Sequence, residues 1–399
     1  MSTVAWLVPS LIEGSGGHRT ILQNAEFLAA HGNGTTLYLE NNNCLLSGES
    51  GADAIFRLFG YRFHDVRVGW DNISPVDSVF ATIWYSARVV RDLPFSCKKL
   101  YFVQDWEACF NPMGDTYLFA ENSYRYGLTP ITIGRWLPHE LKQRFNVDAL
   151  YFDFCADRSI YARLPNVKRE RAIAFIYQPE KPRRGAQMGI EALGIVKYHL
   201  PDVRIYLYGS RERGNVWFDH EHLGLLSLEE CNALYNRVSV GLCISSSNPS
   251  RIPFEMMAAG LPVVELHRSN TLFDLPEDAS LLCDQTPESI AEGLVYLLNT
   301  PERTQQMEAA AVKFMQQRDL SDGYRQFLDA YGRATHGEAD RAAKAAIAPM
   351  YSKPPVVATP FISSIPAEIR ERLIASKPRL DPITRFKKWT KRSLIKALQ

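Results

Sequence analysis

Residues 238–266, which read VSVGLCISSSNPSRIPFEMMAAGLPVVEL, decide the fold of this chain. An apolar run at 238–244 is followed by a serine-rich turn, an apolar-rich helix and a second apolar run, a pattern that predicts strand, loop, helix and strand. Ser250 is suited to the N-cap, Pro253 to the first helical turn and Gly260 to a left-handed helix stop. The stretch therefore predicts a helix that begins at the carboxyl end of a strand in an open α/β sheet.

The start of this predicted helix is suited to an anionic ligand. Backbone N–H groups of a first turn have no intrahelical partner, and ligands of open α/β sheets bind above the strand ends. We therefore place Ser250 and Arg251 at a diphosphate. Glu255, one turn further on, can accept hydrogen bonds from both hydroxyls of a ribose, because an ionised carboxylate offers only acceptors. The alternative is a purely structural unit, since most strand-loop-helix units bind nothing.

The same stretch, with LGLLSLEECNALYNR before it, resembles the donor-nucleotide signature of retaining glycosyltransferases of the glycogen-synthase-like superfamily. Members of that superfamily have the GT-B fold, in which two Rossmann-like domains face each other across a cleft. Two glutamates eight positions apart flank a glycine-containing loop in these enzymes, and the second holds the nucleotide ribose. Glu255 matches the second glutamate, whereas Ser247 stands at the first position. The resemblance implies an α/β chain with the GT-B fold.

Length and composition set the broad class of protein. The 399 residues suit two domains, and a net charge of +1 with 46% hydrophobic residues describes a globular chain without the basic excess of a nucleic-acid binder. Seven cysteines without a CxxC pair argue against a disulfide framework or a structural zinc site, so we expect a reducing cytoplasm. The start of the chain has no basic segment before its apolar run, and no run reaches roughly 18 apolar residues, so we expect neither a signal peptide nor a spanning helix.

Glycines near the amino terminus are a second candidate for ligand binding. An apolar run at 4–8 predicts a buried strand, and the turn at 14–17 precedes a helix expected at 19–30. Gly16 and Gly17 would let backbone N–H groups approach a phosphate or sugar closely, since no Cβ intervenes. A tight connection without a ligand is the alternative. In the resembled family the equivalent loop lies under the donor diphosphate and faces the helix of Glu255.

Acidic residues follow another predicted buried strand, at 100–103. Gln104, Asp105 and Glu107 should emerge at its carboxyl end, where active-site groups gather, and we take these three as candidate catalytic residues. Two carboxylates this close could shift each other's pKa. The alternative is a surface turn with solvated acids around a buried Trp106.

The motif YFVQDWE and the following FNPMGDTYLFAENSYR are similar to rhamnosyltransferases that build rhamnan and surface-layer glycans from dTDP-rhamnose. Many relatives carry His-Asp where this chain has Gln104 and Asp105, and that histidine helps to hold the donor hexose near its six-position. Rhamnose is a 6-deoxy sugar, and a polar group left unpaired against its methyl would cost about 1–3 kcal/mol. The resemblance therefore implies dTDP-rhamnose as donor.

A cationic loop, QPEKPRRGAQMG, follows the strand expected at 172–177. In the resembled family an arginine and a lysine in this loop clamp the diphosphate. Pro179 stands at the approximate arginine position here, and Lys181, Arg183 and Arg184 supply the charge. The alternative is a set of solvated surface cations.

Boundaries follow from these elements. We expect a first Rossmann-like domain at 1–165, a nucleotide-sugar-binding domain at 166–320, a crossover helix at 321–335, and a proline-containing linker with a basic tail at 336–399. Basic and apolar residues alternate at helical spacings across 383–398, which favours an amphipathic helix on an anionic membrane surface. A helix packed on the protein itself or a disordered tail are the alternatives.

The function implied by the resemblance is retaining transfer of L-rhamnose from dTDP-rhamnose to a growing, lipid-linked surface polysaccharide. Asp105 would contact the donor sugar or the acceptor. The resemblance implies no metal or other cofactor, because a helix terminus and basic side chains stabilise the leaving diphosphate. We expect a cytoplasmic protein at the inner face of the cell membrane, without a nucleic-acid partner. Two alternatives stay open: a non-catalytic glycan- or nucleotide-binding subunit, suggested by Ser247 and Pro179, and a nucleotide-sugar epimerase of the same fold.

Overall fold

Two parallel β-sheets follow one another along the chain in the computed structural model, which describes residues 2–336 and 347–375. The first sheet has the order β3-β2-β1-β4-β5-β6-β7 and the second the order β10-β9-β8-β11-β12-β13. The strands of the first sheet are β1 (Thr3–Val8), β2 (Gly34–Leu39), β3 (Asp65–Val68), β4 (Ser78–Ala81), β5 (Lys98–Val103), β6 (Thr129–Ile133) and β7 (Leu150–Phe152). Those of the second are β8 (Glu170–Ile176), β9 (Arg204–Tyr208), β10 (Glu221–Gly224), β11 (Val238–Leu242), β12 (Val263–Leu266) and β13 (Ser280–Cys283).

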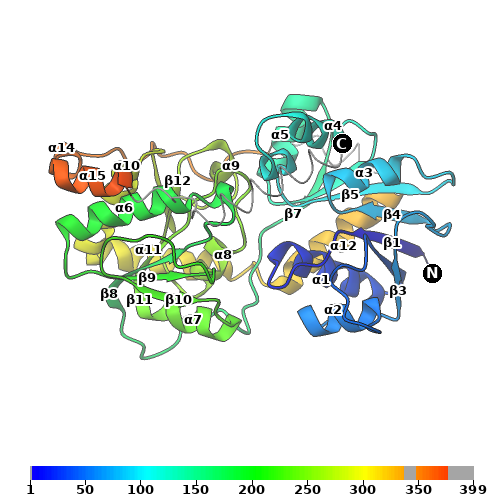
Figure 1. The fold of residues 1–399 in the computed structure, drawn as a ribbon, viewed down its shortest axis with the longest axis horizontal. Coiled ribbons are helices and arrows are strands. Elements are labelled where there is room, and N and C mark those ends of the chain that lie inside the picture. Colours follow the sequence, from blue (N-terminus) through cyan, green and yellow to red (C-terminus); the bar gives the residue numbers. More distant parts are fainter. Residues whose placement is uncertain (1, 337–346, 376–399) are drawn as a thin grey trace, which may run out of the picture.

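Helices cover both sheets, and Figure 1 shows the two resulting units side by side. Around the first sheet lie α1 (Gly16–Ala30), α2 (Gly51–Phe59), α3 (Trp84–Arg91), α4 (Asp115–Ser123), α5 (Trp136–Phe145) and α12 (Leu320–His336), with the 3₁₀ turn η1 (Glu107–Phe110). Around the second lie α6 (Ala186–His199), α7 (Leu228–Arg237), α8 (Ile252–Ala258), α9 (Ser269–Leu272), α10 (Pro287–Asn299), α11 (Pro301–Met315), α14 (Pro360–Ser363) and α15 (Ala367–Ala375), with η2 (Pro182–Arg184). The predicted α/β class with two Rossmann-like units is confirmed.

Strand order determines where each unit can bind a ligand. The order of the first sheet reverses between β1 and β4, and that of the second between β8 and β11. Crevices above the carboxyl ends of strands at such reversals are the usual ligand sites of open parallel sheets. Three loops lie at these two positions: the glycine turn (14–17) after β1, the cationic loop (178–189) after β8 and the serine-rich loop (243–251) after β11.

Local sequence signals account for several helix ends. Ser227 caps α7 in a reciprocal capping box with Glu230, and Gly260 stops α8 with a φ of +69°. The predicted N-cap of α8 is wrong by one residue. Arg251 takes the N-cap position, and the Ser250 hydroxyl accepts a hydrogen bond from the Ile252 N–H at 3.3 Å instead. Arg251 has helical backbone angles, which are unusual at an N-cap, and the Ser250 hydroxyl still satisfies one N–H of the first turn.

The chain crosses between the units more than once. Helix α12 contacts β5, β6 and β7 of the first unit, where Phe327 packs against Phe80 and Phe102. The described residues from 347 onward return to the second unit: Val356 pairs with Cys283, and α14 and α15 contact α10 and α6. This return was not predicted, because the segment reads only as a proline-rich linker.

The helix expected at 383–398 lies outside the described residues. Within 2–336 and 347–375, no helix has the length and apolar character needed to cross a membrane.

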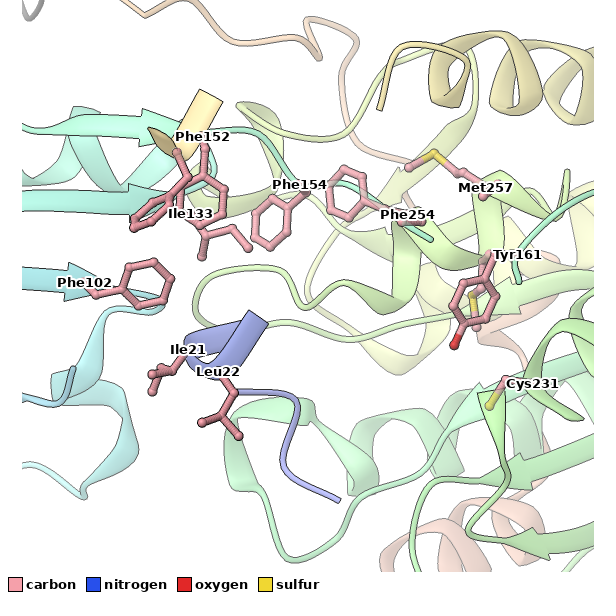
Figure 2. Close-up of a cluster of buried hydrophobic side chains, with 14 of the residues drawn as sticks. Ile21, Leu22, Phe102, Ile133, Phe152, Phe154, Tyr161, Cys231, Phe254 and Met257 are labelled. Carbon is pink, nitrogen blue, oxygen red and sulfur yellow. The ribbon is translucent and has the colours of Figure 1, made fainter. Parts of the chain in front are cut away.

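An aromatic stack joins the two units at their boundary. Phe154, just after β7, stacks on Phe254 of α8 with ring centroids 4.7 Å apart, and one buried cluster contains side chains from both units. Figure 2 shows these two rings side by side between Phe152 and Met257. Apolar packing across the boundary therefore holds α8 against the end of the first sheet.

Candidate functional site

The glycine turn and the end of β5 lie together. Ser15 caps α1, and its hydroxyl accepts a hydrogen bond from the His18 N–H at 3.4 Å. A Cβ added at Gly17 would lie 3.8 Å from the Gln104 side-chain amide, whereas one at Gly16 would meet nothing within 4 Å. The turn therefore leaves open space above the start of α1 and is bordered by Gln104.

Asp105 joins the two units. Its carboxylate accepts hydrogen bonds from the Asn248 N–H at 2.8 Å and from the Ser247 hydroxyl at 3.1 Å, both in the loop after β11. It also accepts the Trp106 N–H at 2.8 Å, and Arg183 Nε lies 3.3 Å away as an ion pair. With only 5% of its surface exposed, Asp105 is occupied by protein groups and holds the serine-rich loop in place.

Asn248 carries no signal in the sequence, yet it ties the loop after β11 to the first unit. Its side-chain amide donates to the carbonyl oxygens of Gln104 at 2.9 Å and Ile133 at 3.1 Å, and the residue is fully buried. Together with the Asp105 contacts, four hydrogen bonds cross from this loop to the ends of β5 and β6. A carboxylate thus lies beside position 247 although residue 247 is a serine, because the first unit supplies it.

Glu107 does not join the other two candidate catalytic residues. Its carboxylate accepts hydrogen bonds from the Trp84 N–H at 2.5 Å and the Tyr101 hydroxyl at 3.0 Å, and the residue is 2% exposed. Burial raises the pKa of this carboxyl to about 8. The side chain therefore points into the first unit, because the 3₁₀ turn after Asp105 rotates it away from the boundary. Its structural placement corrects the expectation of a carboxylate pair in the cleft.

The three predicted cations have different surroundings. Arg184 donates from Nη1 to the Ser245 hydroxyl at 3.0 Å and to the Asn248 carbonyl at 3.2 Å, and burial lowers its pKa. Arg183 pairs with Asp105 and lies over the Phe110 ring, 4.5 Å from its centre. Lys181 is half-buried, and its ammonium has no hydrogen-bond or ion-pair partner among the described residues. Of the three, Lys181 has its charge free for a ligand, while the arginines hold the loop.

Three segments meet at Glu255. The Tyr161 phenol and the cations Arg251 and Arg19 lie close enough to its carboxylate to act on it electrostatically. Burial raises the pKa of Glu255 to about 7, against the opposing effect of these neighbours. Arg251 also donates from Nη1 to the Gln23 side chain at 2.8 Å, which ties α8 to α1. Tyr161 lies in the segment that leads from β7 to β8, and nothing in the sequence indicated that it lies near Glu255.

The arrangement can bind an anion next to a diol. The start of α1, Lys181 and the two arginines near Glu255 supply positive charge or free N–H donors, and Glu255 supplies an acceptor. Among the described residues, no group of three or more His, Cys, Asp or Glu side chains is placed to hold a metal ion.

The GT-B fold is defined by two Rossmann-like units that face each other. Here they meet at the glycine turn and the serine-rich loop, and helix α12 returns from the second unit to the first. Solved structures with this architecture confirm it. Sucrose-phosphate synthase from Thermosynechococcus elongatus superposes with a TM-score of 0.64 at 14% identity, over 84% of this chain and 100% of that one. TarM of S. aureus, solved with fondaparinux, alpha-GlcNAc-glycerol and UDP, has a TM-score of 0.66 at 8% identity, over 83% of this chain and 100% of that one.

Two sequence comparisons also give matches. Residues 171–295 match the family model of the WsaF C-terminal domain. The O-antigen biosynthesis protein RfbC of Myxococcus xanthus is 27% identical over 310 residues, which cover 73% of this chain and 24% of that protein. This chain therefore spans about a quarter of that relative's length.

Proposed function

We propose that this protein is a glycosyltransferase that takes a sugar from a nucleoside diphosphate donor and adds it to a growing surface polysaccharide. The observation that carries the proposal is the half-buried Glu255 at the start of α8, with Tyr161, Arg19 and Arg251 close to its carboxylate. An acceptor of this kind beside cations fits a ribose next to its diphosphate. The similarity to an O-antigen biosynthesis protein supports the polysaccharide as product.

In this proposal each group has a binding or positioning role. Lys181, Arg251 and the N–H groups after Gly16 neutralise the diphosphate as it leaves, which replaces the charge that a metal ion would supply. Glu255 accepts the ribose hydroxyls. Asp105 positions the loop of Ser247 and Asn248, which lies between the two units. Transfer proceeds with retention and without a protein nucleophile.

The donor is dTDP-rhamnose. Gln104 borders the space above Gly17, and its amide stands where a histidine would select a six-hydroxyl in the resembled family. We expect kcat/KM for dTDP-rhamnose to exceed that for dTDP-glucose by about tenfold or more, because differences in transition-state contacts decide such ratios. Initial rates with both donors and UDP-glucose, using purified protein and mass spectrometry of the products, measure this.

The same reactions separate the alternatives. Turnover that persists in EDTA supports metal-independent transfer, and the anomeric configuration of the product, read by NMR, tests retention. Equal use of UDP-glucose would rule out the rhamnose assignment. Nucleotide binding without any product would favour a non-catalytic subunit, and a free sugar formed without acceptor would favour an epimerase.

The acceptor is a lipid-linked glycan, and the basic segment at 383–398 holds the protein at the cytoplasmic membrane face. This part of the proposal rests on sequence alone. Each cation near an anionic surface contributes about 1 kcal/mol, so a few of them give salt-sensitive binding. Deleting residues 381–399 should abolish sedimentation with phosphatidylglycerol vesicles while a soluble acceptor is still used. If the intact protein ignores such vesicles at low salt, the membrane role is wrong.

A further inference from the structure

A separate cavity opens at the hinge between the units, meaning the two segments, after β7 and before α12, where the chain crosses from one unit to the other. It has a volume of about 580 Å³, within the range typical of small-molecule sites, and none of the proposed donor-binding residues lines it. Arg135 and Asp153 form its wall on the first unit, and Lys313 and Phe314 at the end of α11 form its wall on the second. The chain leaves the first unit just after Asp153 and returns through Arg318, so both crossing segments border this cavity.

Positive charge exceeds negative charge on these walls. Arg135 binds the Asp153 carboxylate through Nε at 2.8 Å and Nη2 at 3.2 Å, and Arg318 Nη1 lies 3.4 Å from the same carboxylate. One carboxylate therefore faces two guanidinium groups. Lys313 adds a further cation, while the opposing Asp278 is ion-paired with Lys353 at 3.4 Å.

Several donors on these walls lack acceptors. Arg318 is only 8% exposed, yet its Nε and Nη2 make no hydrogen bond within the described part of the chain, where only Nη1 is engaged, by Asp153 and the Phe154 carbonyl. The Phe314 ring lies 4.4 Å from the Arg318 guanidinium carbon and supports its plane. The Lys313 ammonium and the Gln317 amide likewise have no side-chain partner among residues 2–336 and 347–375.

We propose that this cavity is a second ligand site, for a small molecule bearing a phosphate group, separate from the donor site. A phosphate offers several oxygen acceptors in a compact anion, and charge-assisted bonds from arginine and lysine are the strongest that these walls can make. Because Arg135 lies on the first unit and Lys313 on the second, an anion bound by both favours the arrangement in which the two walls are close.

Inorganic phosphate is the probe for this site. Titration of the full-length protein by calorimetry at constant ionic strength, with and without saturating dTDP, separates the hinge cavity from the donor cleft. We expect saturable phosphate binding that persists with dTDP present. Lys313→Ala should weaken it about tenfold, as expected for one charge-assisted bond, and Gln317→Ala less.

Lys142→Ala is the matched control, because Lys142 is an exposed helical lysine paired with Asp148 at 2.9 Å on α5 and does not line the cavity. It should bind phosphate as the unaltered protein does. Absence of saturable binding, displacement of phosphate by dTDP, or equal affinity in Lys313→Ala would overturn the proposal. Failure of dTDP itself to bind would instead contradict the proposed function, and the titration without nucleotide would still test the hinge site.

Discussion

Asp105→Ala is expected to lower the rate of sugar transfer by about a hundredfold or more and to lower the melting temperature of the protein. The substitution removes the acceptor for the Asn248 N–H and the Ser247 hydroxyl and leaves Arg183 beside Phe110 without its counter-charge. Removing one partner of a buried ion pair costs about 3–5 kcal/mol. A loop displaced by about 1 Å at an active site can reduce a rate by roughly a hundredfold. Initial rates and thermal melting measure both effects.

Two variants control this experiment. Ser247→Ala removes one of the bonds to Asp105 and should cost only about 1 kcal/mol, with a correspondingly smaller loss of rate. Asp71→Ala, at an exposed aspartate of the first unit, should change neither quantity. A lower melting temperature with an unchanged rate would show that Asp105 stabilises the boundary between the units without positioning the reacting groups.

The fold was predictable because its signals are local. Parallel strands buried on both faces read as continuous apolar runs, so the strands expected at 4–8 and 100–103 end at the same residues as β1 and β5. The helix stop at Gly260 and the capping box at Ser227 depend only on residues within a few positions along the chain. The return of residues 347–375 to the second unit carries no such signal, because it depends on a contact between Val356 and the edge strand β13.

For the site, the sequence predicted which residues belong to it but not how they contact one another. The sequence supplied the positions of Asp105, Arg183 and Arg184, but not that they bind one another or the serine-rich loop. Asn248 contacts Gln104 from 144 positions away, and neither residue type nor spacing indicates that pairing. Glu107 shows the opposite error: two positions after Asp105, a 3₁₀ turn directs it into the first unit. Spacing along the chain predicts which residues reach a strand end, but not their partners there.

Glu255→Ala is expected to weaken binding of dTDP by about a hundredfold without unfolding the second unit. Each charge-assisted hydrogen bond to a ribose hydroxyl is worth about 1.5–3 kcal/mol, and the substitution removes two. The Tyr161 phenol also loses a nearby carboxylate, so the melting temperature is recorded for each variant. Calorimetry gives the affinity. An unchanged dissociation constant with an intact melting transition would remove Glu255 from the nucleotide site.

The affinity for dTDP should also rise with pH, and Glu255→Gln tests the cause. Burial raises the pKa of Glu255 to about 7, so in the free protein this carboxyl passes from neutral to ionised as the pH rises from 6 to 8. Only the ionised form presents acceptors to both ribose hydroxyls, and dTDP therefore binds more tightly at pH 8 than at pH 6. The diphosphate of dTDP also ionises in this pH range. Because a glutamine side chain does not titrate, the pH dependence of dTDP binding to Glu255→Gln reports the ionisation of the diphosphate alone. The pH dependence of the unaltered protein should exceed that of Glu255→Gln, and equal slopes would show that Glu255 does not change its charge at the site.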